Sequence, residues 1–140
     1  MKNIVLILVM MVSLGTSVFG ADLSKEMLEQ NKTVIKMAVK AMSEKLPQTV
    51  DKYTQFTAIR SKDLNLIYTF EINTGAKSDE AVIREDKKRM SKHVKEGICQ
   101  SSKRFLDSHI DISYIYVSAK TKKELFRFDV TKNNCEKSVL

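Results

Sequence analysis

The segment LIYTFEI, residues 66–72, decides the fold because its apolar side chains recur at every second position. A period of two is that of a β-strand, whose successive side chains point to opposite faces of a sheet. Tyrosine, phenylalanine and isoleucine are also residue types that strands favour. The segment therefore predicts a strand that turns Leu66, Tyr68, Phe70 and Ile72 toward a core and Ile67, Thr69 and Glu71 away from it.

Eight of the nine aromatic residues after residue 20 fall in four short segments, of which residues 66–72 are one. The other three segments are therefore predicted to be strands as well. The aromatic pairs are Tyr53 and Phe56, Tyr68 and Phe70, Tyr114 and Tyr116, and Phe126 and Phe128. Polar turns near residues 61–63 and 120–122 would join the four strands into two hairpins.

Two amphipathic helices are expected, one before each hairpin. Residues 24–45 carry Leu28, Ile35, Ala38 and Met42 at helical spacing, with Ser24 as the cap and Pro47 marking the end. After a loop, Ser78 caps a long second helix whose apolar stripe rotates past Gly97, which predicts a bend there. The order helix, hairpin, helix, hairpin predicts an α+β domain with a four-stranded, mainly antiparallel sheet and both helices on one face.

The first twenty residues have the pattern of a signal peptide. Lys2 precedes an apolar run from Ile4 to Leu14, and small residues extend to Gly20. The run is too short for a transmembrane anchor, which needs about 20 apolar residues. We expect cleavage after Gly20, one domain over residues 21–140, and a periplasmic or secreted product that is not an integral membrane protein.

Cys99 and Cys135 are the only cysteines, and both lie in the predicted mature chain. Disulfides persist in exported proteins, so we expect these two to pair and to fasten the C-terminal tail to the second helix. The alternatives are free buried thiols or a redox pair, but redox pairs are usually spaced CxxC. A zinc site is disfavoured because no set of four ligands has a suitable spacing.

The chain is basic, with a formal net charge of +7. Because an exported protein seldom meets nucleic acid, an envelope protein or an anionic envelope surface is the expected partner. The strongest charge feature is a stripe on the second helix formed by Arg84, Lys88, Lys92 and Lys95. Its alternative interpretation is an ordinary solvated helix face.

The outer sheet face offers a second candidate partner surface. Ile67, Ile115 and Val117 would be exposed there, and a cluster of exposed apolar residues on a sheet is typical of a partner contact or a homodimer interface. The alternative is that β-branched residues simply form strands well and are tolerated singly at surfaces.

No catalytic, metal or cofactor motif stands out. His93 lies on a charged helix face, and His109 lies in a short helix-to-strand connection. Asn31 fits a glycosylation pattern but falls inside a predicted helix. We therefore predict an exported non-enzymatic accessory or adaptor protein without a cofactor that binds another envelope component. The alternative is a small-ligand-binding or inhibitor module with an apolar pocket between helices and sheet.

Overall fold

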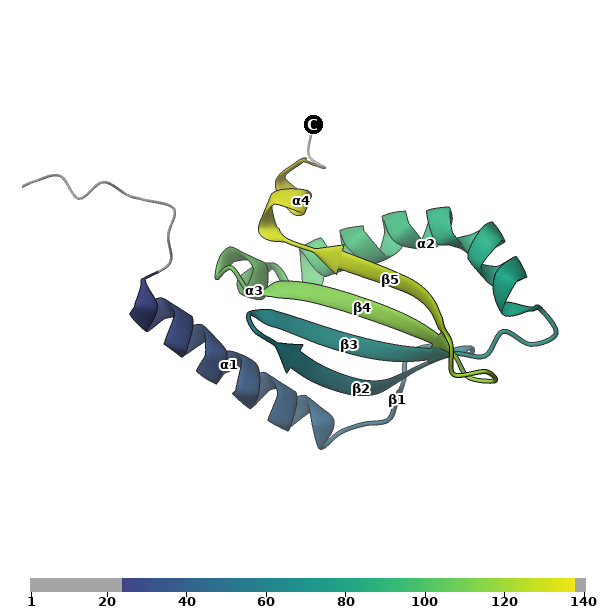
Figure 1. Cartoon of the computed structure of the whole chain (residues 1–140), viewed down its shortest axis with the longest axis horizontal. Coiled ribbons are helices and arrows are strands. Elements are labelled where there is room, and N and C mark those ends of the chain that lie inside the picture. Colours follow the sequence, from purple (N-terminus) through teal and green to yellow (C-terminus); the bar gives the residue numbers. More distant parts are fainter. Residues whose placement is uncertain (1–23, 138–140) are drawn as a thin grey trace, which may run out of the picture.

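The computed structural model describes residues 24–137 as an α+β domain (Figure 1), which confirms the predicted fold class. The elements follow in the order α1 (Lys25–Ser43), β1 (Gln48–Thr49), β2 (Thr54–Lys62), β3 (Asn65–Ile72), α2 (Asp79–Ser101), α3 (Lys103–Asp107), β4 (Asp111–Ser118), β5 (Glu124–Val130) and α4 (Lys132–Glu136). The predicted signal peptide, residues 1–20, lies outside the described residues.

The sheet differs from the prediction in strand number and in one pairing. It has five strands in the order β1-β2-β3-β4-β5, because the two-residue strand β1 pairs with the start of β2. The hairpins β2–β3 and β4–β5 are antiparallel as expected, but the central pair β3–β4 is parallel. The reason is that α2 crosses from the end of β3 back to the start of β4, and such a crossover makes the two strands run in the same direction.

One face of the sheet is aromatic. The parallel register places Tyr68 beside Tyr114 and Phe70 beside Tyr116. The ring centroids of Phe70 and Tyr114 lie 4.8 Å apart, and Phe126 and Phe128 stack on each other. Close aromatic contacts of this kind add to the free energy gained by burial, so this face forms the core of the domain.

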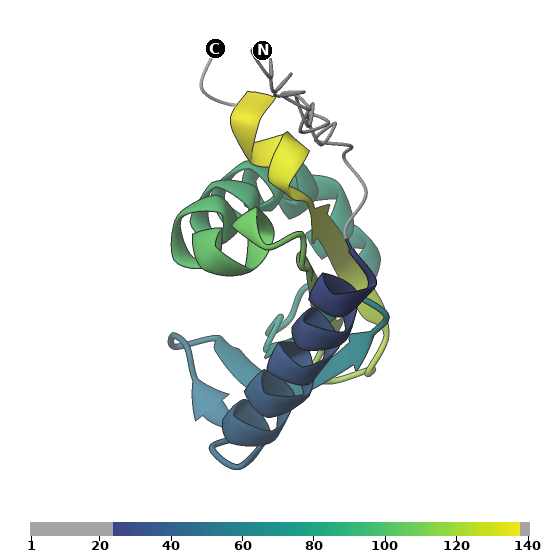
Figure 2. The same cartoon turned by 90° about the vertical axis from the view of Figure 1, so that its left-hand side faces the viewer.

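Both long helices pack on the aromatic face, as predicted. Ile35 of α1 and Ile98 of α2 are each 1% exposed, and they belong to the same core cluster as Tyr68 and Phe70. The helices lie at opposite margins of the sheet, since α1 contacts β2 and α2 contacts β5 (Figures 1 and 2). The two helices are therefore separated by the width of the central strands.

The helix caps agree with the sequence. The Ser24 hydroxyl accepts a hydrogen bond from the Met27 N–H, and the Ser78 hydroxyl accepts one from the Ala81 N–H. Helix α2 runs through Gly97 without a break and is interrupted at Ser102, so the bend near Gly97 stays a prediction. The interruption starts the separate helix α3, which turns Leu106 into the core.

Candidate functional site

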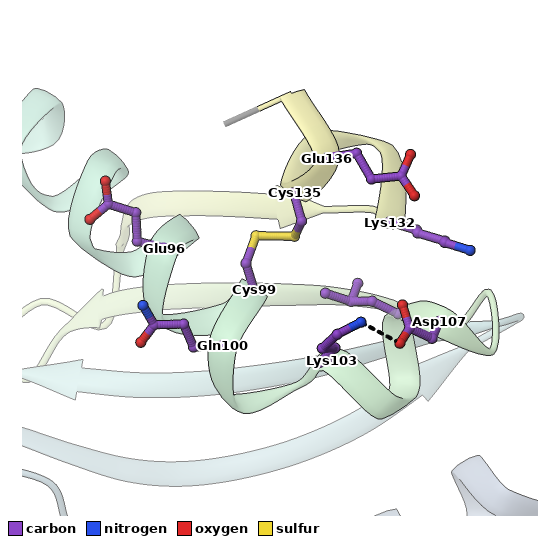
Figure 3. Close-up of a pocket in the computed structure, with 9 residues that line it drawn as sticks. Glu96, Cys99, Gln100, Lys103, Asp107, Lys132, Cys135 and Glu136 are labelled. Atoms are coloured by element: carbon purple, nitrogen blue, oxygen red, sulfur yellow. Dashed lines mark hydrogen bonds and ion pairs between the residues drawn. A yellow bond between two sulfur atoms is a disulfide. The ribbon is translucent and has the colours of Figure 1, made fainter. Parts of the chain in front are cut away.

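The disulfide predicted from the sequence is present. Cys99 of α2 is bonded to Cys135 of α4, with the two Cα atoms 5.6 Å apart (Figure 3). The bond fastens the C-terminal helix, which follows the last strand, onto the second half of α2. The C-terminal end of the described chain is therefore held against the domain by a covalent link.

A hollow of about 450 Å³ lies beside this disulfide, between α2, α3 and α4 (Figure 3). Its rim mixes both charge signs. Lys103 Nζ lies 2.7 Å from Asp107 Oδ2, and this hydrogen bond holds the pKa of Asp107 below its usual range. Because the nearby cation and carboxylate already satisfy each other, the hollow has little net attraction for a charged ligand.

A larger hollow, which we call the cleft, has a volume of about 670 Å³ and lies between α2 and the segment around the β1–β2 connection. The residues that line it are Asp51, Lys52, Tyr53, Thr54, Ile72, Asn73, Thr74, Lys77, Val82, Asp86, Arg89 and Met90. The side-chain oxygen of Thr74 is buried without a hydrogen-bond partner among the described residues. Such a group is rare in folded proteins and marks a place where a bound molecule could supply the missing bond.

Charged side chains around the cleft are mostly paired with one another. Lys77 Nζ lies 2.7 Å from Glu85 Oε2, and this hydrogen bond raises the pKa of Lys77. Arg89 Nη2 lies 2.9 Å from Asp86 Oδ1, and Lys52 sits 5.4 Å from the Tyr53 ring centroid. The cleft thus offers an apolar interior with a largely neutralised rim, which suits an apolar guest better than an ion.

The tyrosines of the aromatic face are not poised for acid–base chemistry near neutral pH. Burial raises the pKa of Tyr68 to about 12, with a smaller effect from Tyr114. Burial also raises the pKa of Tyr114 and of Tyr116. All three hydroxyls therefore stay protonated, and their rings act as packing surface.

Exposed apolar side chains gather in one part of the chain. The exposed large hydrophobic residues of the described chain are Met27, Val34, Met37, Val50 and Tyr53, and we call them the apolar flank. Three belong to α1 and two to the segment around the β1–β2 connection, which also lines the cleft. Met37 is 67% exposed and Tyr53 is 58% exposed, so these side chains contribute little to the core.

The apolar flank was not predicted from the sequence. The pattern placed Tyr53 in a strand, whereas β2 begins only at Thr54 and Tyr53 is exposed. The available signal was the apolar surface of α1, which is wider than one core-facing stripe needs.

The outer sheet face is not the exposed apolar patch that was predicted. Ile67 is 2% exposed and Ile115 is 6% exposed, and only Val117 is half-buried. Arg60 stands directly opposite Ile67, and Arg127 directly opposite Ile115, and long arginine stems can cover such neighbours. The prediction that both isoleucines are exposed is therefore wrong, and the homodimer hypothesis loses the patch on which it rested.

Polar residues complete this outer face. The Ser113 hydroxyl donates a hydrogen bond to Asp129 Oδ1, and the Asn65 amide donates one to the Ser113 oxygen at 2.9 Å. Arg127 Nε lies 3.1 Å from the same Asp129 oxygen. Burial alone raises the pKa of Asp129, but the bonds from Ser113 and Arg127 outweigh this effect and lower it.

The basic stripe lies where the sequence placed it. Its four residues Arg84, Lys88, Lys92 and Lys95 are exposed on α2. The residues of α2 that are buried are Val82 and Ile98, and none of the stripe is among them. The stripe therefore faces solvent. This agrees with both hypotheses for the stripe, an interaction surface and an ordinary solvated helix face.

The isolated candidates have structural explanations. Asn31 is 8% exposed, and its amide nitrogen donates a hydrogen bond to the Ser108 carbonyl at 2.7 Å, so it is not presented for glycosylation. His109 has a φ of 60° in the turn before β4, and His93 is exposed on α2. Within residues 24–137 no three potential metal ligands come together. No helix in that range is long and apolar enough to cross a membrane.

Comparison with protein families identifies one that matches most of the sequence. The profile described as a domain of unknown function (DUF8479) matches residues 28–126, which include most of α1, all of α2 and four of the strands in full. The chain belongs to the DUF8479 family. The match ends within β5, so it leaves out α4 and Cys135, which close the disulfide. No curated protein matches the sequence.

Solved structures share the fold of this DUF8479 member at low sequence identity. A Pseudomonas aeruginosa protein inferred to be secreted, PA3611, superposes with a TM-score of 0.68 at 14% identity, over 83% of this chain and 99% of that one. The type 2 secretion system pilotin EpsS from Vibrio vulnificus has a TM-score of 0.63 at 15% identity, over 80% and 97%.

A second pilotin, AspS of the Vibrio cholerae type II secretion system, has a TM-score of 0.59 at 16% identity, over 79% of this chain and 96% of that one. At these identities the likeness establishes the fold. The names also agree with the sequence prediction of a periplasmic or secreted protein.

Proposed function

We propose that this protein is an exported, non-enzymatic accessory protein that binds another protein of the cell envelope through its apolar flank and the adjoining cleft. The observation that carries the proposal is the position of the exposed large hydrophobic residues, which all fall between Met27 and Tyr53 in the described chain. Exposed apolar clusters on soluble domains are typical of protein contacts. Proteins of secretion systems share the fold, which supports the same role.

Export rests on the signal-peptide pattern of residues 1–20 and on the disulfide. A bond between Cys99 and Cys135 forms readily outside the cytoplasm and is rare inside it. N-terminal sequencing of the protein recovered from the envelope fraction should begin at Ala21. A mature protein that still begins at Met1 would contradict export by this route.

A non-enzymatic role is supported by the chemistry of the hollows. The charged side chains at the cleft are mostly paired, as Lys77 is with Glu85, and the buried Tyr68 of the core holds its proton. General acid–base catalysis requires a group whose pKa lies near the working pH and which can reach a substrate. The apolar flank requires only a complementary apolar surface.

Site-specific photo-crosslinking in living cells tests the proposal. A photoreactive phenylalanine analogue replaces Tyr53 in the apolar flank, and a matched control carries it at Lys62, an exposed residue at the end of β2. We expect a discrete crosslinked envelope protein with the Tyr53 variant only. The same product from Lys62, or no product from Tyr53, would contradict the proposed surface.

The cleft favours a second candidate function, the binding of a small apolar ligand. Its volume of about 670 Å³ is within the range of ligand sites, and the Thr74 hydroxyl lacks a partner. Thermal unfolding measured with fatty acids and cell-wall fragments tests this function. A ligand that raises the unfolding temperature of the parent but not of a Met90→Lys variant would support it, and no shift with any compound would count against it.

A further inference from the structure

The outward face of α2 carries a row of positive charge. Arg84, Lys88, Lys92 and Lys95 are spaced by three or four residues, so they lie along one side of the helix. The row extends over about 16 Å, given the rise of an α-helix. All four side chains are exposed, so the row is open to solvent.

The cations of this row differ in how far acidic groups compensate their charge. Among residues 24–137, Lys32, Lys77 and Lys103 each have a carboxylate oxygen within 2.9 Å. By contrast, neither Lys88 nor Lys92 forms an ion pair within that range, and the nearest pairing of the row is a long one, 3.7 Å between Arg84 and Glu85. Lys88 and Lys92 are therefore uncompensated by an ion pair, whereas Arg84 lies near Glu85 and the charge of Lys95 acts on Asp129.

A shallow hollow of about 620 Å³ adjoins the row. It is lined by Ile83, Arg84, Lys87, Lys88, Ser91 and Lys92, so four of its six residues are cations and none is an acid. Lysine and arginine donate charge-assisted hydrogen bonds to phosphate oxygens, and a serine hydroxyl can add another. The hollow is thus suited in charge and in donors to a phosphate group.

We propose that the α2 face docks on the surface of a membrane rich in anionic phospholipid, with lipid phosphates in this hollow. A straight, open row 16 Å long, by the helical rise, can contact several headgroups at once, whereas a single soluble phosphate would use only part of it. Because the face lacks aromatic residues, the attachment is electrostatic and does not require insertion into the bilayer.

This docking does not depend on the protein partner proposed above. The row lies on α2, whereas Met27, Val34 and Met37 of the apolar flank lie on α1, which contacts β2 at the other margin of the sheet (Figure 2). The cleft borders α2 as well, but through Val82, Asp86, Arg89 and Met90, none of which belongs to the row. A molecule attached through α2 would therefore leave Met27, Val34 and Met37 open for a second contact. The two interactions can be tested separately.

Vesicle flotation with the exported protein tests the inference. The probes are vesicles of phosphatidylcholine alone and vesicles with roughly one-third phosphatidylglycerol, each at about 0.05 M and about 0.5 M salt. We expect binding to the anionic vesicles only, and loss of most of it at the higher salt. Binding to both vesicle types, or to neither, would overturn the inference.

Two variants with the same change in net charge test whether binding depends on the α2 face or only on the total charge of the protein. The double variant Lys88→Glu, Lys92→Glu should bind anionic vesicles about tenfold more weakly or worse. The control double variant Lys36→Glu, Lys40→Glu makes the same charge change at exposed positions of α1 and should keep most of the binding. Equal losses in the two variants would overturn the inference. The inference would also be overturned if the protein did not bind vesicles but free inorganic phosphate shifted the NMR resonances of α2.

Two controls keep the outcome clear. Circular dichroism and the unfolding temperature of both variants should match those of the parent, because all four lysines are exposed. The Tyr53 crosslink should persist in the Lys88→Glu and Lys92→Glu variant. If that crosslink is lost while vesicle binding remains, the row contributes to the protein partner, and the membrane inference is overturned.

Discussion

The side-chain amide of Asn31 on α1 donates a 2.7 Å hydrogen bond to the carbonyl oxygen of Ser108, which lies 77 residues later, at the end of α3. Asn31 is 8% exposed, and the bond is partly buried. It joins the first helix to the connection that enters β4. A residue with the pattern of a glycosylation site thus acts as a structural link between distant parts of the chain.

Replacing Asn31 by alanine should lower the free energy of unfolding by about 1 to 3 kcal/mol, because the Ser108 carbonyl would be left without its partner. Urea unfolding followed by circular dichroism measures this. The control is Gln30→Ala, at an exposed neighbouring position, which should change stability by less than about 0.5 kcal/mol. Equal effects of the two substitutions would show that the link is not stabilising.

The disulfide provides a second test of how the tail is held. In the chain-entropy model, closing a loop between residues 36 apart stabilises the fold by roughly 3 to 4 kcal/mol. The double variant Cys99→Ser and Cys135→Ser should lose about this much in urea unfolding. The parent unfolded in a reducing agent should lose a similar amount, and a parent insensitive to reduction would contradict the estimate.

The four longer strands and the two long helices could be predicted because each carries its own local signal, whereas the short helices α3 and α4 were not predicted. The alternation in residues 66–72 gives β3, and Ser24 and Ser78 cap their helices as their sequence context indicates. Strand β1 could not be predicted, because two residues, Gln48 and Thr49, have no period. Their pairing with Phe56 and Gln55 depends on how the chain returns after α1.

The exposure of side chains was harder to predict than the elements that carry them. Alternation correctly places Ile115 on the outer face, but it does not predict that this side chain is buried; the register sets Arg127 directly opposite, where its stem can cover the isoleucine. Similarly, the cleft brings Tyr53 and Met90 together from separate elements, and no sequence spacing encodes that contact. The sequence alternation therefore predicts which face of the sheet a side chain lies on. Whether that side chain is buried depends on which residues the neighbouring strands place beside it.

The correction at Ile115 can be checked directly. Because Ile115 is 6% exposed, Ile115→Ala should cost about 2 to 4 kcal/mol of unfolding free energy through lost burial and a cavity. The half-buried Val117 on the same strand face is the control, and Val117→Ala should cost less than about 1.5 kcal/mol. Equally small effects would restore the exposed-patch interpretation of this face.

The Thr74 hydroxyl in the cleft has no hydrogen-bond partner in the described chain, so replacing Thr74 by valine should affect stability differently from the same change at Thr57. Thr74→Val removes a buried oxygen that has no hydrogen-bond partner in the described chain, so the free energy of unfolding should stay unchanged or rise. Thr57→Val is the matched control, because the Thr57 hydroxyl donates a 3.3 Å hydrogen bond to the Thr69 carbonyl, and it should lose about 1 kcal/mol. Comparable losses from both variants would mean that Thr74 is satisfied in solution.

The outer-face carboxylate makes stability depend on pH. The pKa of Asp129 is lowered in the folded protein, since hydrogen bonds from Ser113 and Arg127 outweigh the effect of burial. A lowered pKa stabilises the fold above the unfolded-state pKa of the carboxyl, and this contribution is lost as pH falls through the folded-state value. Because the Asp129 side chain is 58% exposed, solvent screens the pair and the contribution should be only about 0.5 to 1 kcal/mol.

The variant Asp129→Asn keeps the shape of the side chain and removes the charge. It should be less stable than the parent at neutral pH, and the difference should shrink toward zero at about pH 2, where the parent carboxyl is protonated as well. Urea midpoints of the two proteins across this range measure the difference. Glu124→Gln, an exposed position on the same strand without a close ion pair in the described chain, is the control and should show little change with pH. A constant gap between parent and Asp129→Asn at every pH would show that the substitution acts through packing and not through the charge.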